Sequence, residues 1–375
     1  MSDIFAPAGE PPTLLGRLRV LSPHASVRVS PLCLGAMNLG ESWSSFMGDM
    51  NKKTAFEILD AFYTAGGNFI DTANNYQNEE SELWIGEWMQ ERQNRDQMVI
   101  ATKFSSPYKS YNKSIKIGHN YTGNSTKSLH ISVRDSLKKL KTDYIDILYI
   151  HFWDFTTSIE ELMTSLNVLI NQGKVLYLGA SDVPAWVVVK ANEWAKHHGM
   201  RGFCVYQGKW NAAFRDLERE ILPMCKIEGL AVCPWSAVGG GKFKSEAELK
   251  AYEERGEKGR QHDGPSENDK KVTKILERLS KTYNSSITAI ALAYVMQKQP
   301  YVFPIVGGRK VSHLMDNIKA LSIKLSTQDI MDIENAIPFD LGFPISFSGP
   351  SPTNWLLKVA GQYDWVEEPK AIGHV

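Results

Sequence analysis

The sequence predicts an α/β fold, a single (β/α)8 TIM barrel of eight parallel strands with an N-terminal hairpin and long rim loops. Three observations predict it: short apolar runs alternate with helical patterns, eight such runs occur, and most are continuously apolar, as in strands buried on both faces. The strand candidates are Leu32–Ala36, Asn68–Asp71, Met98–Lys103, Ile145–His151, Lys174–Ala180, Gly202–Gln207, Leu230–Pro234 and Val302–Val306.

The helices between these strands carry apolar residues at the 3.6-residue period of a half-buried helix. Gly66 follows the first of them as a stop signal. The helix after the fourth strand opens with Ser158 and Glu161, which have the spacing of a capping box, and it ends before Gly173. The apolar stripes are Ala55, Ile58, Leu59 and Phe62; Leu129, Val133, Leu137 and Leu140; Ile159, Leu162, Met163, Leu166 and Leu169; and Val311, Leu314 and Ile318.

Three segments interrupt this alternation. Leu15–Pro31 alternates apolar with polar residues and predicts a hairpin that closes the bottom of the barrel. Ser105–Ser128 is a long polar segment directly after the third strand, and Gly239–Asp269 is glycine-rich and then charged after the seventh. Long loops that follow barrel strands are typical of lids over a site.

The chain of 375 residues is long enough for two domains, but alternating barrels reach this size as one unit. We therefore expect one domain, residues 1–375, with a barrel core of about residues 17–321. Residues 338–375 form a C-terminal extension rich in proline, glycine and aromatic residues. We expect this extension to fold back over the rim.

Composition argues against several kinds of partner. The 42 basic and 42 acidic residues cancel, which gives no support for nucleic acid or an anionic membrane as the main partner. The N-terminus has no apolar signal segment, and no apolar run reaches the length of a membrane helix. The four cysteines form no C-x-x-C pair, which favours small buried residues in a reducing compartment. We expect a cytoplasmic protein, and the oligomeric state is left open.

Four polar residues lie at or just after the ends of three consecutive strand candidates. Asp71 ends the second strand, Tyr76 follows five residues later, Lys103 ends the third and His151 ends the fourth. The C-terminal ends of barrel strands carry the active site in enzymes of this architecture. The spacing therefore predicts that these four side chains converge.

These four groups suit proton transfer to a carbonyl oxygen. A phenol donates a proton at neutral pH more readily when a cation stabilises its phenolate, and Lys103 can supply that cation beside Tyr76. Asp71 can hold the ammonium, and His151 can orient the carbonyl. A hydride donor would complete the set, and since no side chain is one, the pattern implies a cofactor.

The later strand ends resemble a nucleotide seat. Ser181, Asp182 and Gln207 could bond a carboxamide, and Trp235 could stack on a flat ring. The glycine run of 236–242 lets backbone N–H groups approach a pyrophosphate. The segment after the eighth strand, with Gly307, Arg309 and Lys310 before a helix, could hold a phosphate. There is no Rossmann glycine motif after a first strand, no P-loop, and no close spacing of metal ligands near the first strand.

Taken together, these motifs resemble the aldo-keto reductase superfamily, and within it the branch of fungal aryl-alcohol dehydrogenases and norsolorinic acid reductases. The resemblance covers about residues 17–321. The superfamily motifs are 69–73 with Tyr76, Ser81 with Glu82, Lys103, 144–146 leading to His151, and 179–181; the branch motifs are 74–77, 84–88 and 206–215.

The resemblance implies NADP(H) as the cofactor and a small aldehyde, ketone or alcohol, with aryl compounds favoured, as the substrate. It implies Tyr76 as the proton donor, tuned by Lys103 and Asp71, with His151 orienting the carbonyl. The implied cofactor-binding residues are Met37, Ser181, Asp182, Gln207, Trp235, Ser236, Gly239, Gly240, Lys242, Gly307, Arg309, His313, Asp316 and Asn317. No metal is predicted.

Four features depart from the pattern of many relatives. Trp235 stands where many have tyrosine, and it should still stack on a ring. Asp182 replaces an asparagine, and a carboxylate can accept a hydrogen bond from the amide nitrogen of a carboxamide but cannot donate one to its oxygen. Gly-Gly-Arg at 307–309 replaces the common lysine–serine phosphate signature. Glu79 stands where many relatives have glycine, which predicts an altered turn after Tyr76.

Two other functions stay open at the level of sequence. One is a cofactor-binding regulatory subunit with slow turnover, which would bind NADPH and a partner protein. The other is a metal-dependent hydrolase that uses His151, Asp154 and Asp71, and it would lose activity in chelator.

Overall fold

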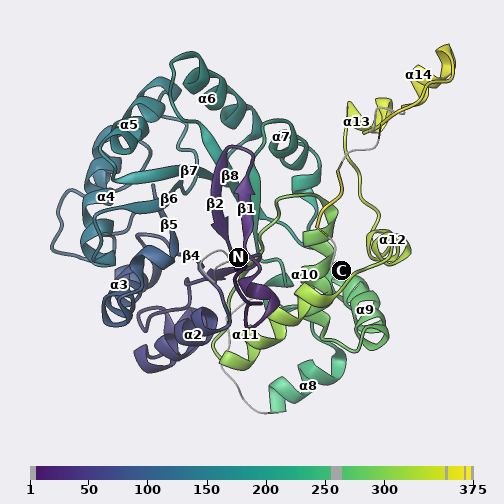
Figure 1. Ribbon diagram of the computed structural model, residues 1–375, viewed down its shortest axis with the longest axis horizontal. Coiled ribbons are helices and arrows are strands. Elements are labelled where there is room, and N and C mark those ends of the chain that lie inside the picture. The colour runs from purple at the N-terminus through teal and green to yellow at the C-terminus, as the bar shows by residue number, and fades with distance from the viewer. Residues whose placement is uncertain (1–5, 255–263, 351–353, 367–368, 373–375) are drawn as a thin grey trace.

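Eight parallel strands form a barrel at the centre of the molecule, and helices surround it (Figure 1). The computed structural model describes residues 6–254, 264–350, 354–366 and 369–372. The sheet runs in the order β10-β3-β4-β5-β6-β7-β8-β9, which confirms the predicted barrel. Its strands are β3 Cys33–Gly35, β4 Phe69–Asp71, β5 Val99–Phe104, β6 Ile145–Ile150, β7 Val175–Ser181, β8 Phe203–Lys209, β9 Ala231–Trp235 and β10 Ile305–Val306.

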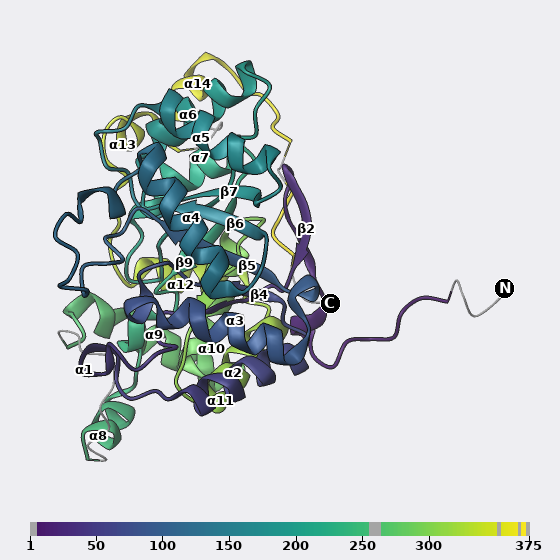
Figure 2. The same cartoon turned by 90° about the vertical axis from the view of Figure 1, so that its left-hand side faces the viewer.

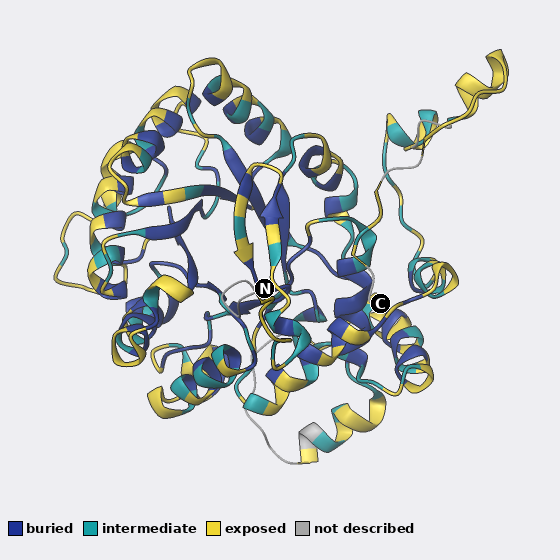
Figure 3. Ribbon diagram, viewed as in Figure 1, coloured by how far each residue is buried: buried dark blue, intermediate teal, exposed yellow. Residues whose placement is uncertain are grey.

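Helices follow the strands and cover the outside of the barrel. In Figure 3 their buried faces point inward and their exposed faces point to solvent, as the predicted apolar stripes require. No helix in the described part of the chain combines the length and apolar content needed to cross a bilayer. The helices are α1 Ser44–Met47, α2 Lys52–Thr64, α3 Glu80–Arg92, α4 Thr126–Leu140, α5 Ile159–Asn171, α6 Ala185–His197, α7 Ile221–Ile227, α8 Glu246–Glu254, α9 Glu267–Thr282, α10 Ile287–Lys298, α11 Val311–Ile318, α12 Thr327–Asn335, α13 Ile345–Ser348 and α14 Trp355–Ala360.

The last strand is shorter than predicted because it is shared between two neighbours. Val302 pairs with Val232 of β9, whereas Ile305 and Val306 pair with β3. Pro304 lies between the two pairings and has no N–H to donate to a ladder. The predicted strand Val302–Val306 therefore closes the barrel through two short pairings, one with β9 and one with β3.

The predicted hairpin closes the bottom of the barrel. It consists of β1 Arg19–Ser22 and β2 Ala25–Val29, paired antiparallel. Its side chains Leu21 and Val29 are fully buried and pack with inward-facing strand residues such as Phe69. Side chains thus fill the barrel interior next to the hairpin. Figure 2 shows β2 at one end of the barrel and α1 and α8 on the opposite side.

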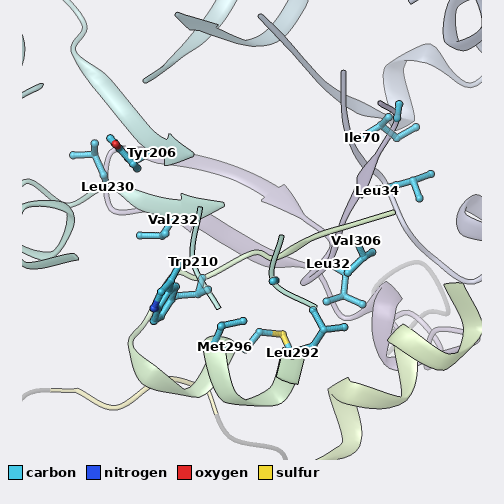
Figure 4. Packing of buried hydrophobic residues seen from close by; sticks show 14 of the residues in the cluster. Leu32, Leu34, Ile70, Tyr206, Trp210, Leu230, Val232, Leu292, Met296 and Val306 are labelled. Carbon is cyan, nitrogen blue, oxygen red and sulfur yellow. The ribbon is translucent and has the colours of Figure 1, made fainter. Parts of the chain in front are cut away.

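A second core lies between the strands and the helices. Helix α10 is apolar on every side and is buried along most of its length. Figure 4 shows Leu292 and Met296 of this helix facing Leu32, Val232 and Trp210 of the strand region. This packing supports the strands whose far ends carry the polar residues.

Two predicted segments differ from expectation. Gly239–Asp269 is not one loop, because it contains α8 and the first turn of α9, with residues 255–263 outside the described part. The C-terminal extension does not cover the rim: α13 and α14 lie outside the ring of helices in Figure 1. Helix α14 exposes Trp355, Leu357 and Val359 to solvent, so no barrel surface draws it back over the strand ends.

The predicted capping box of α5 forms only in part. The Ser158 hydroxyl accepts a hydrogen bond from the backbone N–H of Glu161, as expected. The Glu161 carboxylate does not return to Ser158; it accepts from the N–H and the hydroxyl of Thr126 at the start of α4. Ser158 and Glu161 therefore cap α5, and Glu161 also connects α5 to α4. Gly66 and Gly173 both adopt positive φ after their helices, as predicted.

Candidate active site

The alternation of side chains along each strand brings the predicted catalytic residues together. Residues two apart on a strand share a face, so Asp71 continues the inward row that begins with Phe69 of β4. Lys103 lies above Ala101 on β5, and His151 follows Tyr149 of β6 in the same way. The three polar groups therefore stand on the apolar filling of the barrel, at its open end.

Lys103 is the centre of the site. Its ammonium donates to Asp71 Oδ1 at 2.6 Å, to the Thr72 carbonyl at 2.7 Å and to the Tyr76 hydroxyl at 3.4 Å. Lys103 is fully buried, and Asp71 and Tyr76 are nearly so. The two strong bonds hold the ammonium, and the longer third bond leaves the phenol oxygen only loosely engaged.

Burial and charge oppose each other in this cluster. Burial is the largest single influence on the pKa of Lys103 and lowers it, but Asp71 and Tyr76 together raise the pKa by more, so the ammonium stays charged. Burial raises the pKa of Tyr76 more than Lys103 lowers it, and the phenol stays protonated. Lys103 lowers the pKa of Tyr76, as expected, but burial raises the same pKa by more. The site therefore holds a proton on the group proposed to donate it.

His151 is a neutral imidazole next to the phenol. Burial, followed by the charge of Lys103, lowers its pKa to about 3. Its Nδ1 lies 3.0 Å from the Ser106 hydroxyl, and its ring meets the ring of Tyr76 edge-on with centroids 5.8 Å apart. Its Nε2 makes no hydrogen bond within the part of the chain that the structure describes. That nitrogen is suited to contact a substrate oxygen, in the role predicted for His151.

The residues predicted to bind a carboxamide, Ser181, Asp182 and Gln207, are joined to the Lys103 cluster by a hydrogen bond from Gln207. Gln207 Nε2 donates to Asp71 Oδ2 at 2.9 Å, which leaves the Gln207 Oε1 as an acceptor. Ser181 ends β7 next to Gln207 in the sheet register. Asp182 has a φ of 49°, and its carboxylate accepts from the indole N–H of Trp235 at 3.2 Å. A carboxamide fits this set, with Ser181 as the side-chain donor for its oxygen.

The glycine run after β9 adopts a shape that suits phosphate. Gly239, Gly240 and Gly241 have φ values of 73°, 63° and 94°, which side chains rarely tolerate. A Cβ at Gly240 would lie 3.2 Å from the Ser236 hydroxyl, so the turn keeps that space open. Successive N–H groups in such a turn form a concave anion site. Lys242, 3.8 Å from Asp269, adds a cation at its edge.

The predicted phosphate end is built on α11. Gly307 and Gly308 lead into the helix, and a Cβ at Gly308 would press on His313 at 2.9 Å. Lys310 is the N-cap residue and provides no side-chain cap, so the first N–H groups of the helix have no capping acceptor from it. Arg309 precedes Lys310 in the chain. These residues suit an anionic group at this end.

The remaining predicted cofactor residues occupy different surroundings. Asn317 lies on the buried face of α11, and the Asp316 carboxylate pairs with Lys319 at 2.7 Å. The Met37 carbonyl accepts a hydrogen bond from Gln77 at 3.0 Å. The structure therefore joins Met37 to the turn after Tyr76, whereas it places Asp316 on an exposed ion pair along its own helix.

Among the aromatic residues of the rim loops, Trp43 is the one that meets Tyr76, edge-on at 6.2 Å. Tyr108 is buried and donates to Asp135 of α4. Trp153 is also buried, whereas Phe46 and Phe155 are exposed. Loop position alone does not distinguish these roles, because each depends on which neighbour packs against the ring.

Sequence reasoning missed several residues of the site. Ser106 touches His151 and Lys139 bridges two acids, but neither stands in a motif that signals it. Asp154, proposed above as a metal ligand, instead accepts hydrogen bonds from the backbone N–H groups of Asn124, Thr156 and Thr157. No group of three or more potential metal-binding side chains occurs among the residues described.

A parallel barrel with a lysine-held tyrosine and a histidine at its open end defines a class of carbonyl oxidoreductase. The aldo/keto reductase family model matches residues 31–338, and the chain belongs to this family, whose members use NADP(H). The resemblance seen in the sequence is thereby confirmed.

Similar relatives include three fungal proteins. A putative aryl-alcohol dehydrogenase, AAD14, of Saccharomyces cerevisiae is 56% identical over 94% of this chain and 95% of the relative. Norsolorinic acid reductase B of Dothistroma septosporum is 54% identical over 94% of this chain and 93% of its own length. An aryl-alcohol dehydrogenase [NADP(+)] of Phanerodontia chrysosporium is 53% identical over 99% of both chains.

Proposed function

We propose that this protein interconverts aldehydes or ketones and alcohols with NADP(H), that aryl compounds are its favoured substrates, and that Tyr76 is the proton donor. One observation carries the proposal: a buried ammonium, Lys103, is shared between Asp71 and the Tyr76 hydroxyl. The names of the similar fungal proteins support the substrate class.

The bound NADPH would supply a hydride to the carbonyl carbon, and the chain would supply everything else. Ser181 and Gln207 would hold the carboxamide, and Trp235 would stack on the ring. The glycine turn 239–241 would hold the pyrophosphate, with Arg309 and the start of α11 near the adenosine phosphate. These residues fit the group because they offer a hydroxyl donor and an amide acceptor for the carboxamide, an indole for the ring, and backbone N–H groups for the phosphates.

His151 would orient the carbonyl by donating from Nε2 to its oxygen, with Nδ1 held by Ser106. Tyr76 would give its phenolic proton to the same oxygen as the carbon accepts the hydride, so the carbonyl becomes an alcohol. Lys103 would stabilise the phenolate that remains until the solvent returns a proton. In the reverse direction the phenolate would take the alcohol proton.

The test is NADPH oxidation with a panel of benzaldehydes, comparing the parent with Tyr76→Phe. We expect kcat to fall by about 10²–10⁴-fold, the usual contribution of a positioned acid, with NADPH binding little changed. Tyr144→Phe is the matched control, because the Tyr144 hydroxyl bonds Asp96 away from the site.

Equal rates for Tyr76→Phe and the parent would exclude Tyr76 as the acid. Tight NADPH binding by the parent without turnover of any carbonyl compound would contradict the proposal and support a cofactor-binding regulatory subunit.

A further inference from the structure

The turn directly after Tyr76 has an unusual backbone. Gln77, Asn78 and Glu79 have φ values of 53°, 51° and 82°, three consecutive residues in the left-handed region, and none is glycine. A side chain is disfavoured there because its Cβ crowds the carbonyl oxygen. Such a turn persists only where the surrounding contacts hold it.

Two of the three side chains hold the loop after β3. Gln77 Oε1 accepts from the backbone N–H of Trp43 at 2.7 Å, and Asn78 Oδ1 accepts from the Trp43 indole at 3.1 Å. Gln77 Nε2 donates to the Met37 carbonyl. These bonds set the ring of Trp43 against Tyr76, so one side of the site is built from this turn.

The third side chain of the turn, Glu79, holds the loop after β5. Its Oε1 accepts from Lys109 at 2.6 Å and from the Tyr111 hydroxyl at 2.7 Å, and its Oε2 pairs with Lys139 of α4 at 3.0 Å. Burial raises the pKa of Glu79, but Lys139, Lys109 and Tyr111 together lower it further than burial raises it. The carboxylate is therefore ionised and fully engaged.

The loop that Glu79 holds begins inside the site. Ser106, its second residue, contacts His151, and the loop base is closed by bonds from Gly123 and Asn124 to Ser105. Further along, Lys109 and Tyr111 reach back to Glu79, three residues from Tyr76. The base of loop 105–124 and its buried Tyr108, which donates to Asp135 of α4, are thus fastened independently of Glu79. Lys109 and Tyr111 are the loop residues fastened to the turn after Tyr76.

We propose that Glu79 is a specificity-determining positioning residue: by fastening Lys109 and Tyr111 it fixes the middle of loop 105–124 as one wall of the substrate site, for flat substrates with more than one ring. This rests on the proposed function. A loop that is already ordered does not lose further conformational entropy when a large substrate binds against it, so binding is tighter. A small aldehyde that reaches only Tyr76 and His151 gains nothing from that wall.

The fold tolerates loss of Glu79. Lys139 keeps Glu82 at 2.7 Å and the Asn74 carbonyl at 3.2 Å. Lys109 is partly exposed and can turn to solvent. Glycine at position 79 also accepts a φ of 82° without strain. Glu79→Gly therefore removes the fastening while it favours the backbone of the turn.

The experiment compares Glu79→Gly, Lys109→Met and Tyr111→Phe with the parent, using naphthaldehyde and propanal. For Glu79→Gly we expect KM for naphthaldehyde to rise about tenfold with kcat within about twofold, and kcat/KM for propanal to stay within about twofold. Amide hydrogen exchange in residues 107–123 should become about tenfold faster. Lys109→Met and Tyr111→Phe should each give part of both effects.

Two variants serve as controls. Lys113→Met removes a lysine of the same loop whose one hydrogen bond within the described residues goes to the Ser110 carbonyl, and Glu91→Gln removes an exposed acid of α3. Both variants should match the parent. Equal losses for naphthaldehyde and propanal, or unchanged amide exchange in the loop, would overturn the proposal. Because amide exchange needs no turnover, a parent that reduces neither aldehyde would refute the proposed function while the fastening of the loop is still measured.

Discussion

Two buried lysines, Lys103 on β5 and Lys139 on the following helix α4, have different roles in this molecule. Lys103 lies in a catalytic cluster with Asp71 and Tyr76, and Lys139 lies in a rim cluster with Glu79 and Glu82. Each ammonium has three partners that include a backbone carbonyl. In the rim cluster the other two partners are carboxylates, whereas in the catalytic cluster one of them is a phenol at 3.4 Å.

The difference lies in how each ammonium is satisfied, and it bears on the proposed role of Tyr76. Burying a charge is tolerated where every donor meets a good acceptor, and the rim cluster meets that condition with two acids. The catalytic cluster satisfies its lysine with one acid and one carbonyl, and it directs the third donor at a hydroxyl that can lose a proton. We infer that the rim cluster holds helix α4 against the turn after Tyr76, whereas the catalytic cluster serves as a proton source.

The largest effect should come from breaking the catalytic cluster. Lys103→Met should lower kcat by about 10²–10⁴-fold, because the phenolate of Tyr76 loses its cation. It should also lower the free energy of unfolding by about 3–5 kcal/mol, since Asp71 is left as an uncompensated buried charge. Steady-state kinetics and urea unfolding measure the two effects separately.

A second substitution separates catalysis from stability. Lys103→Met combined with Asp71→Asn removes the unpaired charge and should regain most of the unfolding free energy while it stays inactive. If the double variant regained activity, Lys103 would be a structural residue only.

The next largest effect should come from breaking the rim cluster. Lys139→Met leaves Glu82 buried without its cation and should lower the free energy of unfolding by about 3–5 kcal/mol. The loss in kcat should be far smaller than for Lys103→Met, because no bond of Lys139 reaches Tyr76. Glu82→Gln in the same chain should restore part of the stability. A loss of kcat as large as that of Lys103→Met would remove the distinction between the two clusters.

The smallest effect concerns pH and the neutral imidazole of the catalytic cluster. The pKa of His151 is about 3 in the folded chain and 6.5 as its ordinary value, so the unfolded chain binds the proton first as pH falls. The stability due to the neutral ring is complete above the ordinary value and is lost between that value and about 3, by at most about 1.4 kcal/mol per pH unit.

Urea unfolding near pH 7 and near pH 5 tests this effect. His151→Gln should lose less stability than the parent over that interval, and the exposed His130→Gln of α4 should behave like the parent. A parent and a His151→Gln variant with the same dependence on pH would show that His151 is not held neutral by burial.

Much of the barrel could be predicted from residue order because strands buried on both faces are continuously apolar. The strand that ends at Lys103 and the one that ends at His151 follow that rule, and the structure places their final residues at one end of the barrel. The errors have local causes: Pro304 divides the last strand, Glu161 finds a better donor in Thr126, and charged residues after Gly241 form α8.

The sequence by itself determined which residue types follow which strands, because a parallel barrel aligns all its strand ends and the two-residue period sets which side chains face inward. It therefore specified Asp71, Tyr76, Lys103 and His151 as one group. Only the tertiary structure decided that Glu79 holds the loop after β5. Those contacts join residues about 30 positions apart through a turn of positive φ, and pattern along the chain carries no signal for a distance between two loops.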